Sequence, residues 1–322
     1  MDILYAFAAA SALCFAFMFI SQRQSNVRAN RLAALALFAI FLSLLASVLD
    51  EKLANAGIKW LRYSLLLECG MFFLGPLFYF YTKTLTSPFV RLGKKDLWHL
   101  ALPTCGVAFF TASSFLLPVS EQDYSVVAAK GWNIGFVAAE LLLYIILAVY
   151  TVLEWLLLYR HKKAMLQLTS DADRRQLNWL RHFLTGISGM YLVWMTEVFF
   201  FSEGWFPWLA PVCYLVGLFY LTYFGLRQQE VYAGLQNIDS RLIDNVTHET
   251  TDAQKNPARI LDPKLEHVKS ALLDLLETQK PFLDNGLTLT KLASQMNMPP
   301  YQLSELINIG SGENFFQFIN RY

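Results

Sequence analysis

Hydrophobic residues in the first 226 positions gather into seven long apolar stretches separated by short polar segments. Each stretch is close to the roughly 20 residues that an α-helix needs to cross the hydrocarbon core of a bilayer. The stretches are Ile3–Ile20, Leu32–Leu49, Leu61–Tyr81, Trp98–Leu117, Trp132–Tyr159, Phe183–Phe201 and Trp208–Leu226. The pattern predicts an all-α fold with a seven-helix transmembrane bundle at residues 1–226. Since only Asp2 and no basic residue precedes the first stretch, we expect a retained span rather than a signal peptide.

The pattern becomes polar at residues 227–260, which we interpret as a cytoplasmic linker. Apolar positions still recur there at steps of three and four, at Val231, Leu235, Ile238, Leu242 and Val246. This spacing is typical of a short amphipathic helix. It is compatible with a helix that pairs with its copy in a homodimer, and equally with a helix that lies on the membrane or on the next domain.

Residues 261–322 return to helical periodicity and predict a small water-soluble unit. A first amphipathic helix ends at Lys280-Pro281, and two shorter ones follow across a tight turn, which is the pattern of a helix-turn-helix. Asn297 stands at the turn, where a left-handed conformation is needed, and Pro299 and Pro300 end one helix and begin the next. The apolar positions of the two short helices are Leu289, Leu292, Ala293 and Met296, then Leu303, Leu306 and Ile307.

Composition and the distribution of charge strengthen the membrane interpretation. The 322 residues are 55% hydrophobic and 16% charged, whereas soluble domains carry about 25% charged residues. Thirteen Lys and Arg residues lie in or beside the first, third and fifth loops, and four lie in or beside the second, fourth and sixth. By the positive-inside rule the N-terminus is outside and the C-terminal domain is cytoplasmic.

Acidic residues within the apolar stretches are candidates for a polar site. Glu68, Glu140 and Glu197 are each about 9–14 Å below the outer surface at 1.5 Å per residue, and Glu154 is nearer the cytoplasmic end, within reach of Arg160. One interpretation is a site for a small cationic or hydrogen-bonding ligand, or a proton sensor. The other is that these carboxyls hydrogen-bond neighbouring helices to one another.

No catalytic or metal-binding pattern accompanies these features. The five His and four Cys residues show no metal-ligand or disulfide spacing, and there is no nucleophile elbow or glycine-rich phosphate loop. We therefore expect no enzyme activity, no metal and no cofactor. An integral-membrane enzyme or transporter that uses Glu68, Glu140 and Glu197 remains a lesser alternative.

An ordered set of sequence blocks closes the chain. The blocks are Lys280-Pro281-Phe282-Leu283-Asp284, Leu287-Thr288-Leu289 with Leu292-Ala293, Tyr301 to Asn308, and Asn314-Phe315 with Ile319-Asn320-Arg321-Tyr322. Residues 261–322 resemble the DNA-binding domain of AraC/XylS-family transcription regulators, and the whole chain resembles membrane-bound members of that family in bacteria. The family's domain has two helix-turn-helix units joined by a long helix, so the resemblance implies a partial domain that holds the first unit.

The resemblance implies a regulator in the bacterial inner membrane that senses an unknown small-molecule or envelope signal. Its second short helix would enter the major groove of operator DNA. The protein would bind as a dimer and together with a second helix-turn-helix. The implied DNA-binding residues are Lys291, Pro300, Tyr301, Gln302, Ser304, Glu305 and Asn308. From Arg259 onward six basic residues oppose seven acidic ones, a weak balance for binding phosphates. The alternative is therefore a receptor-like membrane protein whose cytoplasmic end is a protein-interaction module without DNA binding.

Overall fold

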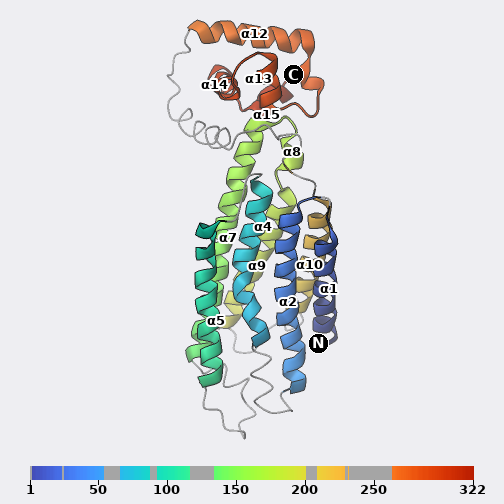
Figure 1. Cartoon of the computed structure of the whole chain (residues 1–322), viewed down its shortest axis with the longest axis vertical. Helices are drawn as coiled ribbons and strands as arrows, with labels where there is room; N and C mark the ends of the chain where they lie inside the picture. Colours follow the sequence, from blue (N-terminus) through green and yellow to red (C-terminus); the bar gives the residue numbers. More distant parts are fainter. Residues whose placement is uncertain are drawn as a thin grey trace. The chain divides into compact units, whose positions relative to one another are not determined.

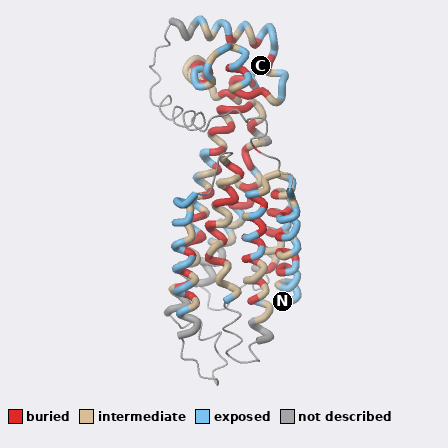
Figure 2. The backbone as a smooth tube through the Cα atoms, in the orientation of Figure 1, coloured by how far each residue is buried: buried red, intermediate tan, exposed pale blue. Residues whose placement is uncertain are grey.

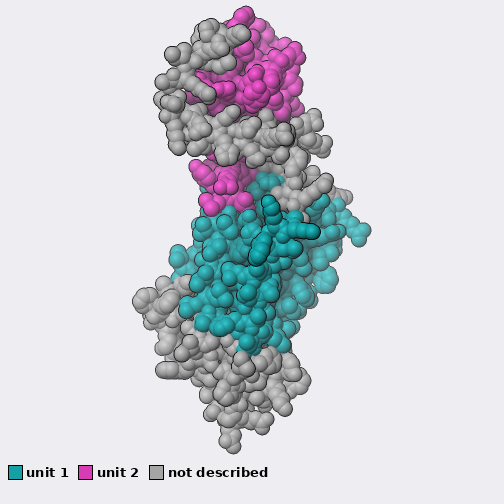
Figure 3. All heavy atoms as spheres, turned by 60° about the vertical axis from the view of Figure 1, so that its left-hand side comes forward, with its two compact units in different colours: residues 1–155, 179–230 teal, residues 156–178, 231–322 magenta. Residues whose placement is uncertain are grey.

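A computed structural model describes residues 2–23, 25–53, 66–87, 93–116, 134–200, 209–228, 231 and 263–322. Throughout these ranges the regular elements are helices, joined by one isolated β-bridge between Thr169 and Thr288 (Figure 1). The predicted all-α fold is thus confirmed. The chain forms two compact units (Figure 3). Residues 1–155 and 179–230 form the bundle unit, and residues 156–178 and 231–322 form the C-terminal unit.

Three helical segments are long and apolar enough to cross a membrane, among the residues that the structure describes. They are Ile3–Ser21, Val27–Leu49 and Ala138–Leu168. The chain is therefore a membrane protein by the length and composition of its helices. The predicted count of seven spans and the predicted orientation stay predictions, and most of the predicted linker 227–260 lies outside the described residues.

The first two helices of the bundle unit pack through small side chains. Helices α1 (Asp2–Ser21) and α2 (Val27–Leu53) run side by side (Figure 1). Buried alanines recur every four residues on α1, at Ala8, Ala12 and Ala16. A small residue in each turn lets two helix backbones approach closely. Helix α10 (Leu209–Arg227) packs on α1, where the rings of Phe15 and Phe219 meet edge to face with centroids 5.0 Å apart.

The third predicted span is not a continuous α-helix. A 3₁₀ segment, η2 (Cys69–Phe73), precedes α4 (Leu74–Thr86). Pro76 explains the change, because its missing N–H cannot bond to the carbonyl of Phe72 and its ring crowds that carbonyl. The Leu74 N–H instead donates to the Met71 carbonyl three residues back. The break therefore lies in the turn that precedes Pro76.

Two of the remaining bundle helices, α5 (Trp98–Leu116) and α7 (Ile134–Leu168), form an apolar cluster with η2. Segment η3 (Lys94–Leu97) leads into α5, and α9 (Asn178–Phe200) comes later in the chain. The cluster centres on Phe72, Phe110, Ile146 and Tyr150. Between α4 and η3, Lys83 donates to Asp96 at 2.6 Å, and the Gly93 N–H donates to the same carboxylate at 2.8 Å.

The C-terminal unit is built on the last turns of α7. Its elements are the end of α7 from Leu156, α8 (Ala172–Arg175), α12 (Pro263–Gln279), η4 (Pro281–Leu283), α13 (Leu289–Gln295), α14 (Pro300–Ser311) and α15 (Phe315–Asn320). The predicted first amphipathic helix is confirmed as α12, which buries Leu272 and Leu276 and ends before Lys280-Pro281. Helix α7 runs nine residues beyond its predicted end at Tyr159, since Ala164, Met165 and Leu168 give it a buried face in this unit.

Candidate functional site

Two short helices meet across a tight turn near the end of the chain. Helix α13 begins at the N-cap Thr288, whose hydroxyl oxygen accepts the Lys291 N–H at 3.2 Å. The turn contains Asn297 with φ of +53°, and α14 begins at Pro300. The predictions of a left-handed residue at Asn297 and of a helix start at Pro300 are confirmed.

The predicted apolar faces of the two helices also form a core. Leu289, Leu292 and Ala293 are fully buried, as is Leu303, and Leu306 and Ile307 are each 2% exposed. Helix α15 closes the same core with Phe315, Phe318 and Ile319. It begins with a capping box, in which Asn314 and Gln317 each accept the backbone N–H of the other. The packing leaves one face of α14 toward solvent.

That solvent-facing side of α14, the candidate face, presents five of the predicted DNA-binding residues. Tyr301 and Gln302 are exposed, and the Gln302 amide donates to the Tyr301 hydroxyl at 3.1 Å. Pro300, Glu305 and Asn308 are half-buried beside them. Gln302 can form a bidentate pair with adenine, and the Glu305 carboxylate can accept from cytosine. These residues offer a phenol, an amide and a carboxylate to a partner.

Ser304 was predicted to be one of the DNA-binding residues of α14, but it is only 2% exposed. At 100° per residue it lies three residues before the buried Ile307 and so about 60° from it around the helix. Its hydroxyl oxygen lies 3.4 Å from the side-chain amide nitrogen of Asn308, which donates to it. Ser304 therefore holds Asn308 in place from the core side and does not belong to the candidate face.

Lys291 is engaged within its own unit. Its ammonium group lies 3.2 Å from the Asp284 carboxylate and donates to the Gly286 carbonyl at 2.9 Å. The Gly286 N–H and Lys291 both bond to Asp284 and hold the pKa of this carboxyl below its ordinary value. A phosphate would therefore compete with Asp284 for Lys291. The pair is about half exposed, so water already screens most of its attraction.

The segment that follows α7 contacts the start of the α13–α14 pair. Thr169 and Thr288 form an antiparallel bridge, and the Ser170 N–H donates to the Leu287 carbonyl at 3.1 Å. From the end of α15, the Asn320 side-chain amide donates to the Ser170 carbonyl at 3.4 Å. Sequence reasoning treated residues 160–181 as a basic loop and missed this contact, although the buried spacing of Ala164, Met165 and Leu168 carries a signal for it.

The predicted intramembrane carboxyls differ in burial where the structure describes them. Glu68 is half-buried before η2, and Glu140 is exposed on α7. Glu197 falls within α9, but its side chain lies outside the described residues. Glu154 is 3% exposed and within electrostatic range of the Tyr191 hydroxyl. No group of three metal-binding side chains occurs among the described residues.

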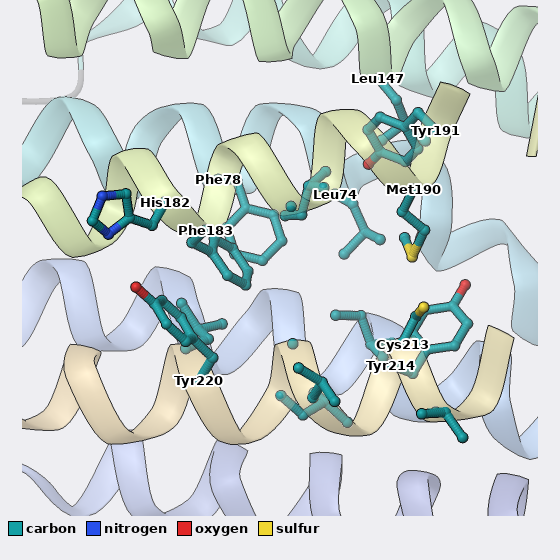
Figure 4. Close-up of a pocket in the computed structure, with 18 of the residues that line it drawn as sticks. Leu74, Phe78, Leu147, His182, Phe183, Met190, Tyr191, Cys213, Tyr214 and Tyr220 are labelled. Carbon is teal, nitrogen blue, oxygen red and sulfur yellow. The ribbon is translucent and has the colours of Figure 1, made fainter. Parts of the chain in front are cut away.

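A cavity of about 420 Å³, the bundle cavity, lies between α9 and α10, with α2, α4 and α7 also contributing lining residues. Figure 4 places His182 and Tyr220 at one end and Tyr191 and Tyr214 at the other. The middle is apolar, with Leu74, Phe78 and Phe183. Sequence reasoning missed this site, since helical periodicity does not reveal which apolar faces stand apart.

Tyr191 and Tyr214 lie at the end of the bundle cavity away from His182 (Figure 4). The Tyr214 hydroxyl is within electrostatic range of Tyr191 and Glu68, and also of Tyr5 and Tyr144. These residues come from α1, α7, α9, α10 and the helical residues before η2. Glu68 is thus linked electrostatically to Tyr214, and the predicted three-carboxyl set stays a prediction. The available sequence signal was the presence of phenols in otherwise apolar spans.

Comparisons of the chain with protein-family models, with curated proteins and with solved structures find no match.

Proposed function

We propose that the protein is a membrane-embedded transcription regulator of the bacterial inner membrane, with a sensing module of seven spans and a cytoplasmic AraC-type helix-turn-helix that binds DNA sequence-specifically. The observation that carries the proposal is the α13–α14 pair. Its helices bury their apolar faces against each other across the left-handed Asn297 and leave Tyr301 and Gln302 exposed on α14. This arrangement suits a helix whose first turns enter the major groove.

Contacts from the candidate face have distinct roles in this proposal. Gln302 and Asn308 read adenine, Glu305 reads cytosine, and Tyr301 packs on a thymine methyl group. Lys291 contacts phosphate after it leaves Asp284. Pro300 lies in the first turn of α14, where its ring limits how closely DNA can approach the helix backbone. Because one reading helix specifies only a few base pairs, binding as a dimer with a second helix-turn-helix supplies the remaining specificity.

In this proposal the signal reaches the α13–α14 pair through α7. This helix runs unbroken from the bundle unit into the C-terminal unit, and Thr169 and Ser170 directly after it bond to Leu287 and Thr288. Thr288 is the N-cap of α13. A shift of the end of α7 would therefore displace Thr288 at the start of the α13–α14 pair. This displacement would couple the bundle unit to the candidate face.

Selection from a random DNA library tests the proposal. The full chain is reconstituted in nanodiscs and tethered in pairs, because a dimer is proposed, and bound duplexes are sequenced after several rounds. We expect a recurrent motif whose affinity falls with increasing salt. Gln302→Ala should relax one base position at a cost of about 1–3 kcal/mol. Lys291→Ala should weaken all sequences uniformly and lower the salt slope by about one. Gln279→Ala, an exposed glutamine on α12, is the matched control.

A second candidate function is favoured by the Lys291–Asp284 pair, which neutralises the predicted phosphate contact. In that case the candidate face is a docking surface for a cytoplasmic protein, and the chain is a receptor-like protein without DNA binding. No enriched motif, together with equal retention of all duplexes by the wild type and Gln302→Ala, contradicts the regulator and supports this alternative.

A further inference from the structure

The bundle cavity has two unlike ends and an apolar middle. His182 and Tyr220 lie at one end, and Phe78 and Phe183 follow toward the middle (Figure 4). The cavity is bordered by helix faces that expose apolar side chains, with Val216 64% exposed on α10 and Leu192 70% exposed on α9. A molecule that enters from the hydrocarbon region of a bilayer would thus meet an apolar opening.

Charges at the His182 end are basic. Arg181 precedes His182 on α9, and Arg227 ends α10. The two helix ends are joined at this level, because the Trp179 indole N–H donates to the Gln228 side-chain oxygen at 2.6 Å. The one acidic residue of α9 and α10, Glu197, stands fifteen residues after His182 at the other end of α9. The His182 end therefore favours an anion.

We propose that the bundle cavity binds a free long-chain fatty acid, with its carboxylate at Arg181 and His182 and its alkyl chain along Phe183 toward Tyr191 and Tyr214. The inference names the ligand of the sensing half of the proposed function. A volume of about 420 Å³ lies near the lower end of the range for small-molecule sites, roughly 300–1,000 Å³, and suits one alkyl chain better than a two-chain lipid.

The ligand would act on the helices that line the cavity. Leu147 of α7 is among the lining residues, and α7 continues to Leu168. Filling the space between α9 and α10 changes the packing that α7 meets in the bundle. Thr169 and Ser170, which bond to Thr288 and Leu287, follow α7 directly in the chain.

Two glycines on α9 give a matched pair of variants. Gly186 lines the cavity, and Gly189 does not belong to the lining. A Cβ atom added at either position meets nothing within 4 Å, so both sites have open space at the point where a new side chain begins. Gly186→Leu places a branched side chain in the cavity, whereas Gly189→Leu changes the same helix by the same chemistry outside it.

The experiment labels the full chain in detergent micelles with a photoreactive palmitic acid analogue and maps the cross-links by mass spectrometry. We expect labelled peptides from α9 and α10, and loss of roughly 90% of the label in Gly186→Leu, whereas Gly189→Leu stays within about twofold of the wild type. Palmitate should compete at least about tenfold better than hexadecanol or hexadecylamine. The double variant Arg181→Gln, His182→Gln should remove that preference and retain labelling by the photoreactive alcohol.

Equal competition by acid, alcohol and amine would mean that ordinary lipid fills the cavity, and would overturn the inference. Unchanged labelling of Gly186→Leu would overturn it as well. Because the labelling requires no DNA, its outcome is separate from the selection experiment. Labelling without DNA selection would contradict the proposed function and support the fatty-acid site. DNA selection without labelling would support the proposed function and contradict the fatty-acid site.

Discussion

Figure 2 marks the buried and exposed residues of both units, and the two units differ in where their large apolar side chains lie. In the bundle unit many large apolar residues face outward, such as Ile3, Phe17 and Ile145 at 84%, 62% and 55% exposure. In the C-terminal unit the leucines of α13 and α14 are buried, and Leu289, Leu292 and Leu303 are fully so. The difference reflects the surrounding solvent, because lipid tails are as apolar as leucine and water is not.

The same contrast separates the forces that hold each unit. The hydrophobic effect drives the C-terminal unit together, since burial removes its leucines from water. Within a bilayer that driving force is absent, and helices associate through close packing and hydrogen bonds. The buried alanines of α1 and the hydrogen bond between Trp179 and Gln228 are contacts of this kind. Substitutions can therefore test which solvent each unit meets.

The largest effect is expected from Leu292→Ala in the C-terminal unit. It removes a fully buried side chain and leaves a cavity, at a cost of roughly 2–5 kcal/mol in the free energy of unfolding. Hydrogen exchange of the α13 and α14 amides measures that cost, and Leu283→Ala, at a 72% exposed leucine, should change it by less than about 0.5 kcal/mol. Equal protection in both variants would mean that no water-facing core exists here.

An aspartate at an exposed apolar position distinguishes lipid from water. Ile145→Asp on α7 places a charge near the middle of a predicted span, which costs about 2.5–3.5 kcal/mol of insertion free energy. Leu283→Asp places the same charge on a surface that faces water and should be nearly neutral. The fraction of protein that resists alkaline carbonate extraction measures insertion. Full resistance of Ile145→Asp would contradict a lipid-facing surface.

A smaller effect is expected at the turn between α13 and α14. Asn297 has φ of +53°, and alanine in that conformation is strained by about 1 kcal/mol. Asn297→Ala should therefore speed hydrogen exchange of α13, while Asn297→Gly should preserve or slow it, since glycine adopts positive φ freely. If alanine and glycine behaved alike, the turn would not need a left-handed residue.

The smallest effect is the acid sensitivity of the two Lys–Asp pairs, one in each unit. Lys83, hydrogen-bonded to Asp96, lowers the pKa of that carboxyl, and the Gly286 N–H and Lys291 lower the pKa of Asp284. Because both folded pKa values are depressed, each pair's stabilisation is complete above the ordinary carboxyl pKa of about 3.9 and is lost as the pH falls through the lower folded value.

The bundle pair should contribute more than the C-terminal pair. The Lys83 and Asp96 side chains are 24% and 17% exposed, whereas Lys291 and Asp284 are 52% and 53% exposed. Asp284→Asn should therefore cost less than about 1 kcal/mol at pH 7, and Asp96→Asn should cost more. Thermal unfolding of both variants and the wild type from pH 7 to pH 3 measures this, with the differences shrinking toward the acid end. A difference that does not shrink as the pH falls would assign the effect to packing.

Local patterns predicted the C-terminal helices well. The left-handed Asn297, the helix start at Pro300 and the buried stripe of α13 each depend on a few neighbouring residues. Ser304 was misplaced because the width of a buried stripe depends on how the helices cross, and not on the residue's polarity. Lys291 was expected to be free for phosphate, but the turn at Asp284 to Gly286 brings a carboxylate and a carbonyl to it.

Local patterns predicted the candidate sites in the membrane less well. Glu68, Glu140 and Glu197 were predicted to share one depth, yet equal depth does not determine whether side chains face one another. Glu140 is exposed, and Glu68 is half-buried within electrostatic range of Tyr214. The bundle cavity was not predicted because its lining is as apolar as any helix face in contact with lipid.

Amino-acid order was enough to establish an all-helical chain with membrane-spanning segments and the local geometry of the last sixty residues, because hydrophobic length and capping act within one or two turns. The three-dimensional packing alone showed that residues 156–178 join the C-terminal unit and that α9 and α10 enclose a cavity. In a bilayer, helix neighbours and lipid are equally apolar, so hydrophobicity cannot specify which faces meet. That choice depends on shape, which is a property of the assembled helices.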